Sequence, residues 1–465
     1  MKVTVLGAGG VRTPLMVRSF ITRQNRVGLD ELALMDVDAN RLELMACLTA
    51  PLEQSQTPFR GQNPLRFKIT RTTDARAALA GADFVITTFR VGDMAGRAID
   101  ERVALKHGAL GQETTGPGGF AMGMRTLPVL FHYLEVMREV CPDAWLINFA
   151  NPAGMLAEAV VNHGHWPRAV GICDAPASML RGAALFLQAP PQEIFLEYFG
   201  LNHLGWARGV WHRGRNRLPE LIERFTRAGV DVPGFPFEPG LIQALGMLPN
   251  EYLYYYYSNE AVPNLLRAGR TRGEQLLELN TQLFADLEHA RAEEDFEKMQ
   301  GLFEAYHRAR GESYFVAETG GKGTHDLSPM NYEQLEALAD EGYAGVALNV
   351  MEALTGHAPK VLILNVANQG AVGGMRDDDV VEAPCWVSHG LIRPLALGTV
   401  PDHALGLMKQ VKAYERLTIE AALTGSYTKA LAALSLHPLV PTHHAAKAIL
   451  DEYVEKHGAT FPALR

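Results

Sequence analysis

Long apolar runs, clustered basic residues and disulfide-type cysteine spacings are all missing from this chain of 465 residues. No stretch of eighteen apolar residues occurs, which argues against a membrane-spanning helix. The 43 Lys and Arg are outnumbered by 52 Asp and Glu, and without a basic cluster this net charge of −9 argues against a nucleic-acid binder. The cysteines are scattered: Cys47, Cys141, Cys173 and Cys385. We therefore expect a cytoplasmic protein, in whose reducing surroundings a cysteine is free to bind a metal.

The first half of the chain alternates short apolar runs with helical segments. The segment Met1–Gly7 runs straight into a glycine-rich turn, which predicts a first strand rather than a signal peptide. Apolar runs predict buried parallel strands at Val3–Leu6, Glu31–Met35, Phe84–Thr88, Ala144–Phe149 and Ala169–Ile172. Amphipathic segments such as Met122–Val140 lie between them. This alternation predicts an α/β fold with a Rossmann-type, doubly wound parallel sheet.

The pattern changes near residue 200, and the length of the chain favours two domains. We expect a first domain over residues 1–200 and a second, of mixed α+β type, over 201–465. Glu274 to Arg310 has helical periodicity. Further strands are expected at Val361–Val366, Val380–Glu382 and Trp386–Val387, and further helices at His403–Thr424 and Ala445–Lys456.

A glycine-rich turn, Gly7-Ala8-Gly9-Gly10-Val11-Arg12, follows the first predicted strand and opens a predicted helix. Gly7 permits a tight turn, while Gly9, the second glycine, lets the backbone approach a pyrophosphate at the helix N-terminus. Asp36 ends the second predicted strand, 29 positions after Gly7, where a carboxylate binds ribose hydroxyls and repels a 2′-phosphate. These residues predict NAD binding, with NAD favoured over NADP. The alternative is a glycine turn of another α/β fold, because Arg12 replaces the third glycine of the fingerprint.

Cys173 and His203, which lie 30 positions apart, are the two candidate metal ligands. A thiolate and an imidazole both bind divalent transition metals well. Cys173 ends a predicted strand, where open α/β sheets form their ligand crevices. Considered separately, each residue is more often a buried thiol or a core histidine than a ligand.

Further motifs follow one another along the chain: Thr13-Pro14, Arg90-Val91-Gly92, Asp100-Glu101-Arg102, Gly111 to Gly119, Asn151-Pro152-Ala153-Gly154, Gly200-Leu201-Asn202-His203, Tyr252-Leu253-x-Tyr255-Tyr256 and Thr271-Arg272. With the Gly7–Gly10 turn and Cys173-Asp174-x-Pro176, they resemble the family 4 glycoside hydrolases, glycosidases that need NAD and a divalent metal. The motifs are collinear from residue 7 to about 390. Chance explains one of them but not the whole series.

The resemblance implies a role for each matching residue. Cys173 and His203 match the metal ligands, with Mn²⁺ the usual ion, and two protein ligands leave coordination positions for substrate hydroxyls. Asp174 matches a general acid. Tyr252 matches the base that removes the C2 proton of the sugar, although most of the tyrosines crowded at 252 and 254–257 are expected to pack as aromatics. Gly7, Gly9, Gly10, Val11 and Asp36 match the NAD site.

The implied reaction is a hydrolysis that proceeds through oxidation. NAD⁺ takes hydride from C3, the metal polarises the resulting carbonyl, and the C2 proton becomes acidic enough for Tyr252 to remove. The C1 leaving group departs with the assistance of Asp174. Water then adds, and the NADH formed at the start reduces C3 again, so that no net redox change occurs. Retaining and inverting glycosidases normally use two carboxylates instead, and the NAD-dependent family is an exception.

Two arginines point to a phosphorylated substrate. In the 6-phosphoglycosidases of the family, arginines at the positions of Arg90 and Arg272 bind the sugar phosphate, and a guanidinium makes bidentate bonds to such a dianion. Asn151 and Asn202 are expected to bind sugar hydroxyls, and Glu113 to orient water at the metal. The expected substrate is thus a small phosphorylated disaccharide or aryl glucoside, with no nucleic-acid or membrane partner. We expect a homodimer or homotetramer whose second domain resembles that of lactate and malate dehydrogenases.

The anomeric preference is open between two branches of the family. Cys-Asp-x-Pro is typical of 6-phospho-α-glucosidases, which favours α. The surroundings of His203 and Tyr252 look most like the 6-phospho-β-glucosidases, and we predict β. Less favoured alternatives are an NAD-dependent 2-hydroxy acid dehydrogenase, which would use a His–Asp pair without a metal, and a non-enzymatic NAD sensor.

Overall fold

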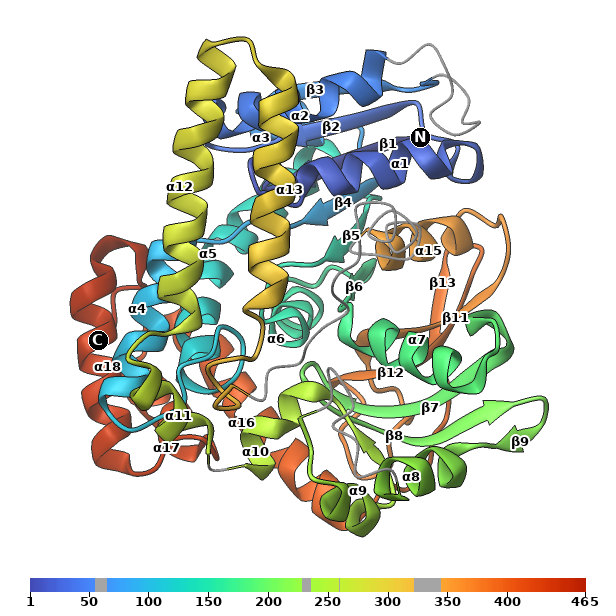
Figure 1. The fold of residues 1–465 in the computed structure, drawn as a ribbon, viewed down its shortest axis with the longest axis vertical. Helices are drawn as coiled ribbons and strands as arrows, with labels where there is room; N and C mark the ends of the chain where they lie inside the picture. The colour runs from blue at the N-terminus through green and yellow to red at the C-terminus, as the bar shows by residue number, and fades with distance from the viewer. Residues whose placement is uncertain (55–64, 228–235, 259, 322–343) are drawn as a thin grey trace.

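A mixed sheet of 13 strands runs through the described residues of the computed structural model (Figure 1). The structure describes the chain except for residues 55–64, 228–235, 259 and 322–343. The strand order is β10-β8-β7-β12-β11-β6-β5-β4-β1-β2-β3, with β13 beside β12 and β9 beside β8. The sheet therefore has a parallel half, β3 to β6, and an antiparallel half, β11 to β10.

The parallel half has the strand order of a dinucleotide-binding fold, so the predicted α/β class is confirmed. Its strands are β1 (Lys2–Leu6), β2 (Glu31–Met35), β3 (Lys68–Thr72), β4 (Phe84–Thr87), β5 (Trp145–Asn148) and β6 (Ala169–Gly171). The sequence patterns predicted each of them except β3. That strand reads Lys-Ile-Thr-Arg-Thr and lies at the edge of the sheet, where polar residues replace the apolar run of a buried strand.

Helices cover both faces of the parallel half, because successive strand side chains point to opposite faces. Val3 and Val5 pack with α1 (Thr13–Val27), α2 (Ala39–Gln54) and α15 (Gly345–Leu354). Leu6 packs on the other face with α3 (Ala75–Leu79), α4 (Asp93–Lys106) and α5 (Gly116–Val140). The sheet thus separates two hydrophobic cores.

The antiparallel half continues the same sheet beyond β6. It contains β11 (Lys360–Ala367), β12 (Val380–Ser388), β13 (Leu391–Pro394), β7 (Ile194–Leu201), β8 (Leu204–His212), β9 (Arg215–Asn216) and β10 (Leu248–Pro249). The β7–β8 hairpin was not predicted. The domain division expected at residue 200 falls at the end of β7 and remains a prediction.

The remaining helices lie around the two halves of the sheet. They are α6 (Ala153–Glu158), which continues as a π-helix over Ala159–His163, α7 (Ala175–Leu187), α8 (Leu218–Arg227), α9 (Pro239–Leu245), α10 (Tyr254–Tyr257), α11 (Ala261–Ala268), α12 (Arg272–Ala292), α13 (Phe296–Glu312), α16 (Asp402–Thr424), α17 (Tyr427–Leu436) and α18 (His443–His457). Figure 1 shows α12 and α13 standing side by side, and α16 to α18 gathered near α4. Among the helices in the described ranges, none has the length and apolar character needed to cross a membrane.

Two expected elements differ from those observed. The helical stretch Glu274 to Arg310 is two helices, because Glu294 adopts a left-handed φ of 58° and Asp295 caps α13 by accepting a bond from the Lys298 amide at 2.9 Å. The strands expected at Val380–Glu382 and Trp386–Val387 are one strand, β12, which passes through Pro384. Pro384 keeps its place in the ladder because its carbonyl accepts a bond from the Leu395 amide at 2.8 Å.

Candidate active site

The carboxyl ends of the parallel strands bring together residues that are distant in the sequence. Gly7 follows β1, Asp36 follows β2, and Arg90 lies three residues after β4. Asn151 follows β5, in a loop where its peptide bond with Pro152 is cis, and Cys173 follows β6. Open α/β sheets bind their ligands at this edge, because the loops that leave the strands meet there.

The glycine-rich turn is tied to Asp36. The Gly9 amide donates to the Asp36 carboxylate at 2.7 Å, and the Gly7 amide donates to the Met35 carbonyl at 2.9 Å. A Cβ on Gly9 would lie 2.9 Å from the Asp36 carboxylate, so no larger residue fits without a shift. Gly10 accepts the Thr13 amide at 2.9 Å, and the Val11 carbonyl lies 3.3 Å from the His307 ring. The backbone of the turn and the Asp36 carboxylate therefore lie next to each other at the carboxyl end of β2.

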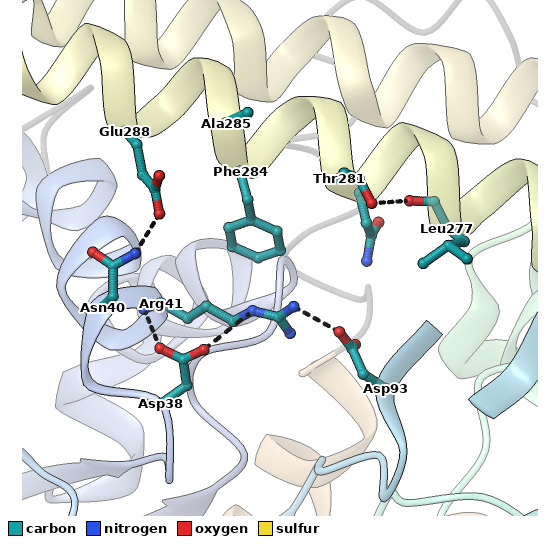
Figure 2. A pocket seen from close by; sticks show the side chains of 10 residues that line it. Asp38, Asn40, Arg41, Asp93, Leu277, Thr281, Phe284, Ala285 and Glu288 are labelled. Carbon is teal, nitrogen blue, oxygen red and sulfur yellow. Dashed lines mark hydrogen bonds and ion pairs between the residues drawn. The ribbon is translucent and has the colours of Figure 1, made fainter. Parts of the chain in front are cut away.

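A cleft of about 330 Å³ adjoins this turn, between the start of α2 and helix α12 (Figure 2). Arg41 crosses it, bonded to Asp93 at 2.6 Å and 3.5 Å from Asp38. The Arg41 guanidinium also lies over the Phe284 ring of α12, 4.6 Å from its centroid. The cleft thus combines charged groups from the first half of the chain with an aromatic ring from the second.

Cys173 and Asp174 lie between β6 and α7. The Cys173 side chain is buried, whereas that of Asp174 is half exposed, and the Cys173 sulfur lies 4.0 Å from an Asp174 oxygen. The Arg12 guanidinium lies 3.8 Å from the other Asp174 oxygen. Burial, together with the negative charges of Glu382 and Asp174, raises the pKa of the Cys173 thiol. A nearby cation would reverse this effect by favouring the thiolate.

His203 occupies the turn of the β7–β8 hairpin with a left-handed φ of 61°. Such a backbone is uncommon for residues other than glycine and is found preferentially at functional sites. The His203 ring is buried, and its Nδ1 lies 2.5 Å from the Thr114 hydroxyl, so that Nε2 is directed to other partners. Burial lowers the pKa of His203 to about 4, which keeps the imidazole neutral as metal binding requires.

Tyr252 stacks on His203, with ring centroids 3.7 Å apart and planes inclined by 10°. Its hydroxyl lies 3.1 Å from the Tyr314 hydroxyl, which lies 2.9 Å from a Glu251 carboxylate oxygen. Burial and the negative charges of Glu251 and Cys173 raise the pKa of Tyr252. Cys173, Asp174, His203 and Tyr252 therefore share one electrostatic environment, although they come from three separate segments.

The other tyrosines of this segment contribute mainly aromatic packing. Tyr254 and Tyr255 are buried against Phe315, and the Tyr257 hydroxyl accepts a bond from Trp206 at 3.0 Å. Tyr314, by contrast, was not a sequence candidate. No motif surrounds it, and only the fold brings its hydroxyl to Tyr252.

Glu382 of β12 is a buried carboxylate that sequence reasoning missed. It accepts bonds from Tyr198 at 2.8 Å, Asn365 at 3.1 Å and Asn202 at 3.4 Å. Burial raises the pKa of Glu382 to about 7. Asn202, expected to bind a sugar hydroxyl, is thus held by a group from a distant strand. The sequence offered one signal for Glu382, which is that a charged residue stands within an otherwise apolar strand pattern.

Arg90 contacts Glu113, which lies in the loop before α5. The Arg90 guanidinium donates to Glu113 at 2.7 Å, and the Arg97 guanidinium donates to the same oxygen at 2.5 Å. Although burial alone would raise the pKa of Glu113, the two arginines lower it below its usual range. Thr114, the next residue, bonds to His203. The loop with Glu113 and Thr114 therefore contacts both Arg90 and Arg97 on one side and His203 on the other.

Arg272 is the first residue of α12 and is buried. It donates to the Arg310 carbonyl at 2.5 Å, to Gln275 at 2.9 Å and to Ser313. Burial and the neighbouring positive charges of Arg310 and Arg97 lower the pKa of Arg272 to about 10. Buried like charges of this kind are costly unless an anion joins them. Arg97 and Arg310 were not sequence candidates, since neither lies in a recognisable motif.

The residues present fit a divalent metal and a dinucleotide. A buried thiol and a neutral imidazole are suitable transition-metal donors, and the His203–Thr114 bond supplies the orienting contact that metal-binding histidines typically have. Within the described ranges, no group of three or more His, Cys, Asp or Glu side chains has a metal-holding arrangement. A metal bound by Cys173 and His203 therefore needs further ligands from solvent or substrate. The close approach at Gly9 and the Asp36 carboxylate suit NAD.

Comparison with known proteins shows the family of the chain. The model of family 4 glycosyl hydrolases matches residues 2–188, and the model of their C-terminal domain matches residues 198–440. The chain belongs to the family 4 glycosyl hydrolases. It is 32% identical to a probable 6-phospho-beta-glucosidase of Bacillus subtilis, over 99% of this chain and 97% of that protein.

Solved structures of similar proteins include both branches of the family. The 6-phospho-beta glucosidase of Thermotoga maritima with manganese, NAD⁺ and glucose-6-phosphate has a TM-score of 0.79 and 27% identity, covering 99% of this chain and 100% of that one. A 6-phospho-alpha-glucosidase from gut microorganisms, in complex with NAD and Mn²⁺, has a TM-score of 0.81 and 27% identity, covering 100% and 99%. A lactate dehydrogenase from a deep-sea metagenome library, at 12% identity and TM-score 0.51, covers 91% of this chain and 98% of that one and shares the fold alone.

Proposed function

We propose that this glycosidase hydrolyses 6-phospho-β-glucosides and requires NAD and a divalent metal, Mn²⁺ being the expected ion. The observation that carries the proposal is the gathering of Cys173, His203 and Tyr252 beside a set of buried arginines. Membership of family 4 favours this function over a 2-hydroxy acid dehydrogenase. The cytoplasmic location and the homodimeric or homotetrameric assembly remain predictions.

NAD would bind along the edge formed by the glycine-rich turn and Asp36. The amides of the turn and the start of α1 would face the pyrophosphate, and Asp36 would accept the ribose hydroxyls. The cleft beside it, which the Arg41 side chain and the Phe284 ring both line, would take the adenosine end (Figure 2). A 2′-phosphate would meet the carboxylates of Asp36 and Asp38, so NADP is disfavoured.

The sugar phosphate would bind among the buried arginines. The positive charges of Arg310 and Arg97 lower the pKa of Arg272, and a phosphate dianion would relieve this repulsion. Arg90 would supply a further guanidinium once released from its pairing with Glu113. Since guanidinium–phosphate bonds are strong and directional, this cluster also selects phosphorylated sugars over unphosphorylated ones.

When bound, NAD supplies a hydride acceptor and the divalent ion supplies a Lewis acid. Cys173 and His203 would hold the ion, and Asn151 and Asn202 would orient sugar hydroxyls. Tyr252, whose ring stacks on the candidate metal ligand His203, would take the C2 proton. Asp174, half exposed next to Cys173, would protonate or stabilise the departing group.

A 6-phospho-α-glucosidase is the second candidate, favoured by Asp174. An acidic residue directly after the cysteine is typical of the α branch, and here its carboxylate faces Arg12 at 3.8 Å. Removal of the C2 proton does not depend on the anomeric configuration, so the same residues serve either substrate. The β preference rests on the segments around His203 and Tyr252, and on the 32% identity with the Bacillus subtilis protein.

The direct test compares p-nitrophenyl 6-phospho-β-glucoside with its α anomer, each incubated with NAD⁺ and Mn²⁺. We expect nitrophenol release from the β substrate without accumulation of NADH, and a lower rate when NADP⁺ replaces NAD⁺. Faster release from the α anomer would assign the protein to the α branch. Net NADH formation with a 2-hydroxy acid, and no nitrophenol, would contradict the glycosidase proposal.

Replacement of Arg272 by alanine should raise KM for phosphorylated substrates by about 10- to 100-fold, because each charge-assisted bond contributes about 1.5–3 kcal/mol. Steady-state kinetics on 6-phosphorylated and unphosphorylated nitrophenyl glucosides would measure the effect. Arg270→Ala is the matched control, since Arg270 is an exposed arginine paired with Glu278. An equal loss with both substrates would remove the phosphate role of Arg272.

A further inference from the structure

Glu382 lies between the two segments that carry the candidate metal ligands. Strand pairing aligns Gly200 of β7, Glu382 of β12, Asn365 of β11 and Gly171 of β6 in one row across the sheet. Gly171 precedes Cys173 by two residues, and Gly200 precedes His203 by three. Two strands, β12 and β11, therefore lie between the strand that leads to Cys173 and the strand that leads to His203. Contacts across these strands set the separation of the two segments.

One Glu382 oxygen joins the two sides of this row. It accepts the Asn202 amide at 3.4 Å, next to His203, and the Asn365 amide at 3.1 Å. The Asn365 amide also reaches the Gly171 carbonyl, at 3.4 Å, on the strand that leads to Cys173. The absence of a side chain at Gly171 makes this possible, because a Cβ there would lie 2.9 Å from the Asn365 Cβ.

The second Glu382 oxygen is fixed by Tyr198. The Tyr198 hydroxyl donates to it at 2.8 Å, and Tyr198 belongs to β7, the strand that ends at the His203 turn. Glu382, Tyr198 and Asn365 are each at most 1% exposed, so water does not compete for these bonds. A buried carboxylate on β12 that accepts bonds from β7, from the turn after β7 and from β11 restricts how these segments move relative to each other.

We propose that Glu382 is a positioning residue, which holds the Cys173 loop and the His203 turn at the separation that one divalent cation requires. This inference rests on the metal dependence of the proposed function. Contacts that orient metal ligands in this way typically change metal affinity by about 10- to 100-fold when removed.

The test measures Mn²⁺ binding to the purified protein from the electron paramagnetic resonance signal of free Mn²⁺, which does not depend on turnover. Glu382→Ala should weaken binding by about 10- to 100-fold. Glu382→Gln should bind within about threefold of the wild type, because its amide oxygen still accepts from Asn202 and Asn365 while its NH₂ meets the Tyr198 hydroxyl. Equal losses in both variants would show that charge rather than position matters, and would overturn the inference.

Two further variants keep the test decisive. Glu352→Ala is the matched control: Glu352 is a buried carboxylate paired with Lys360 at 2.5 Å, and its loss should lower thermal stability without changing Mn²⁺ affinity. Asn365→Leu breaks the same bridge from the opposite side and replaces Glu382→Ala if that variant does not fold. If the affinity for Mn²⁺ were unchanged in Asn365→Leu or Glu382→Ala, the inference about Glu382 would be overturned and the proposed function would stand. If the wild-type protein did not bind Mn²⁺, both the inference and the metal requirement of the proposed function would be overturned.

Discussion

Replacement of Cys173 by serine should abolish metal-dependent hydrolysis while the fold is kept. A serine hydroxyl is a much poorer ligand than a thiolate, and with only His203 left on the protein side the site would lose its ion. Lewis-acid stabilisation is worth several kcal/mol, so kcat/KM should fall by on the order of 10³-fold. Nitrophenol release at increasing Mn²⁺ concentrations, together with the thermal unfolding midpoint, would measure both parts of this result.

Cys141→Ser is the matched control for this substitution. Cys141 is also buried, with 4% exposure, but it follows α5 at the amino end of β5, on the opposite edge of the sheet. Its replacement should lower stability and leave the Mn²⁺ dependence unchanged. If Cys173→Ser kept full activity in the presence of a chelator, Cys173 would not be a metal ligand.

Replacement of Tyr252 by phenylalanine should lower kcat by about 10²- to 10⁴-fold, the usual contribution of a general base, with little change in KM. The ring that stacks on His203 remains, and only the hydroxyl that contacts Tyr314 is lost. If Tyr252 removes the C2 proton, the wild type should incorporate solvent deuterium at C2 of the product in D₂O, and in the variant the rate of this incorporation should fall together with kcat. Steady-state kinetics and mass spectrometry of the product would measure these effects.

Tyr257→Phe separates this role from general aromatic packing. Tyr257 belongs to the same tyrosine-rich segment, and its hydroxyl accepts a bond from Trp206 at 3.0 Å rather than facing the Cys173 region. Its kcat should stay within about threefold of the wild type, because the lost hydrogen bond to Trp206 contributes about 1 kcal/mol to stability and takes no part in removing the C2 proton. Undiminished kcat and deuterium incorporation in Tyr252→Phe would assign the base to another residue.

Motifs whose residues are close together in the sequence could be recognised from the sequence alone. Gly7, Gly9 and Asp36 are recognisable because a strand, a tight turn and a helix N-terminus follow one another within a short stretch of chain. The buried strands of the parallel half were predictable for a similar reason, since covering both faces demands continuous apolar runs. The turn that divides α12 from α13 was not, because helical periodicity continues through it.

The sequence by itself determined the α/β class and the dinucleotide turn, because each depends on local residue type and order. It made Cys173 and His203 the pair of candidate ligands only through the resemblance to a family. Only the tertiary structure decided which groups surround that pair. Glu382 and Tyr314 reach it from β12 and from the segment after α13, and Arg97 and Arg310 meet Arg272 from α4 and α13. Their positions follow from strand order, pairing register and helix packing. These depend on long-range burial of apolar surface, which a local pattern does not encode.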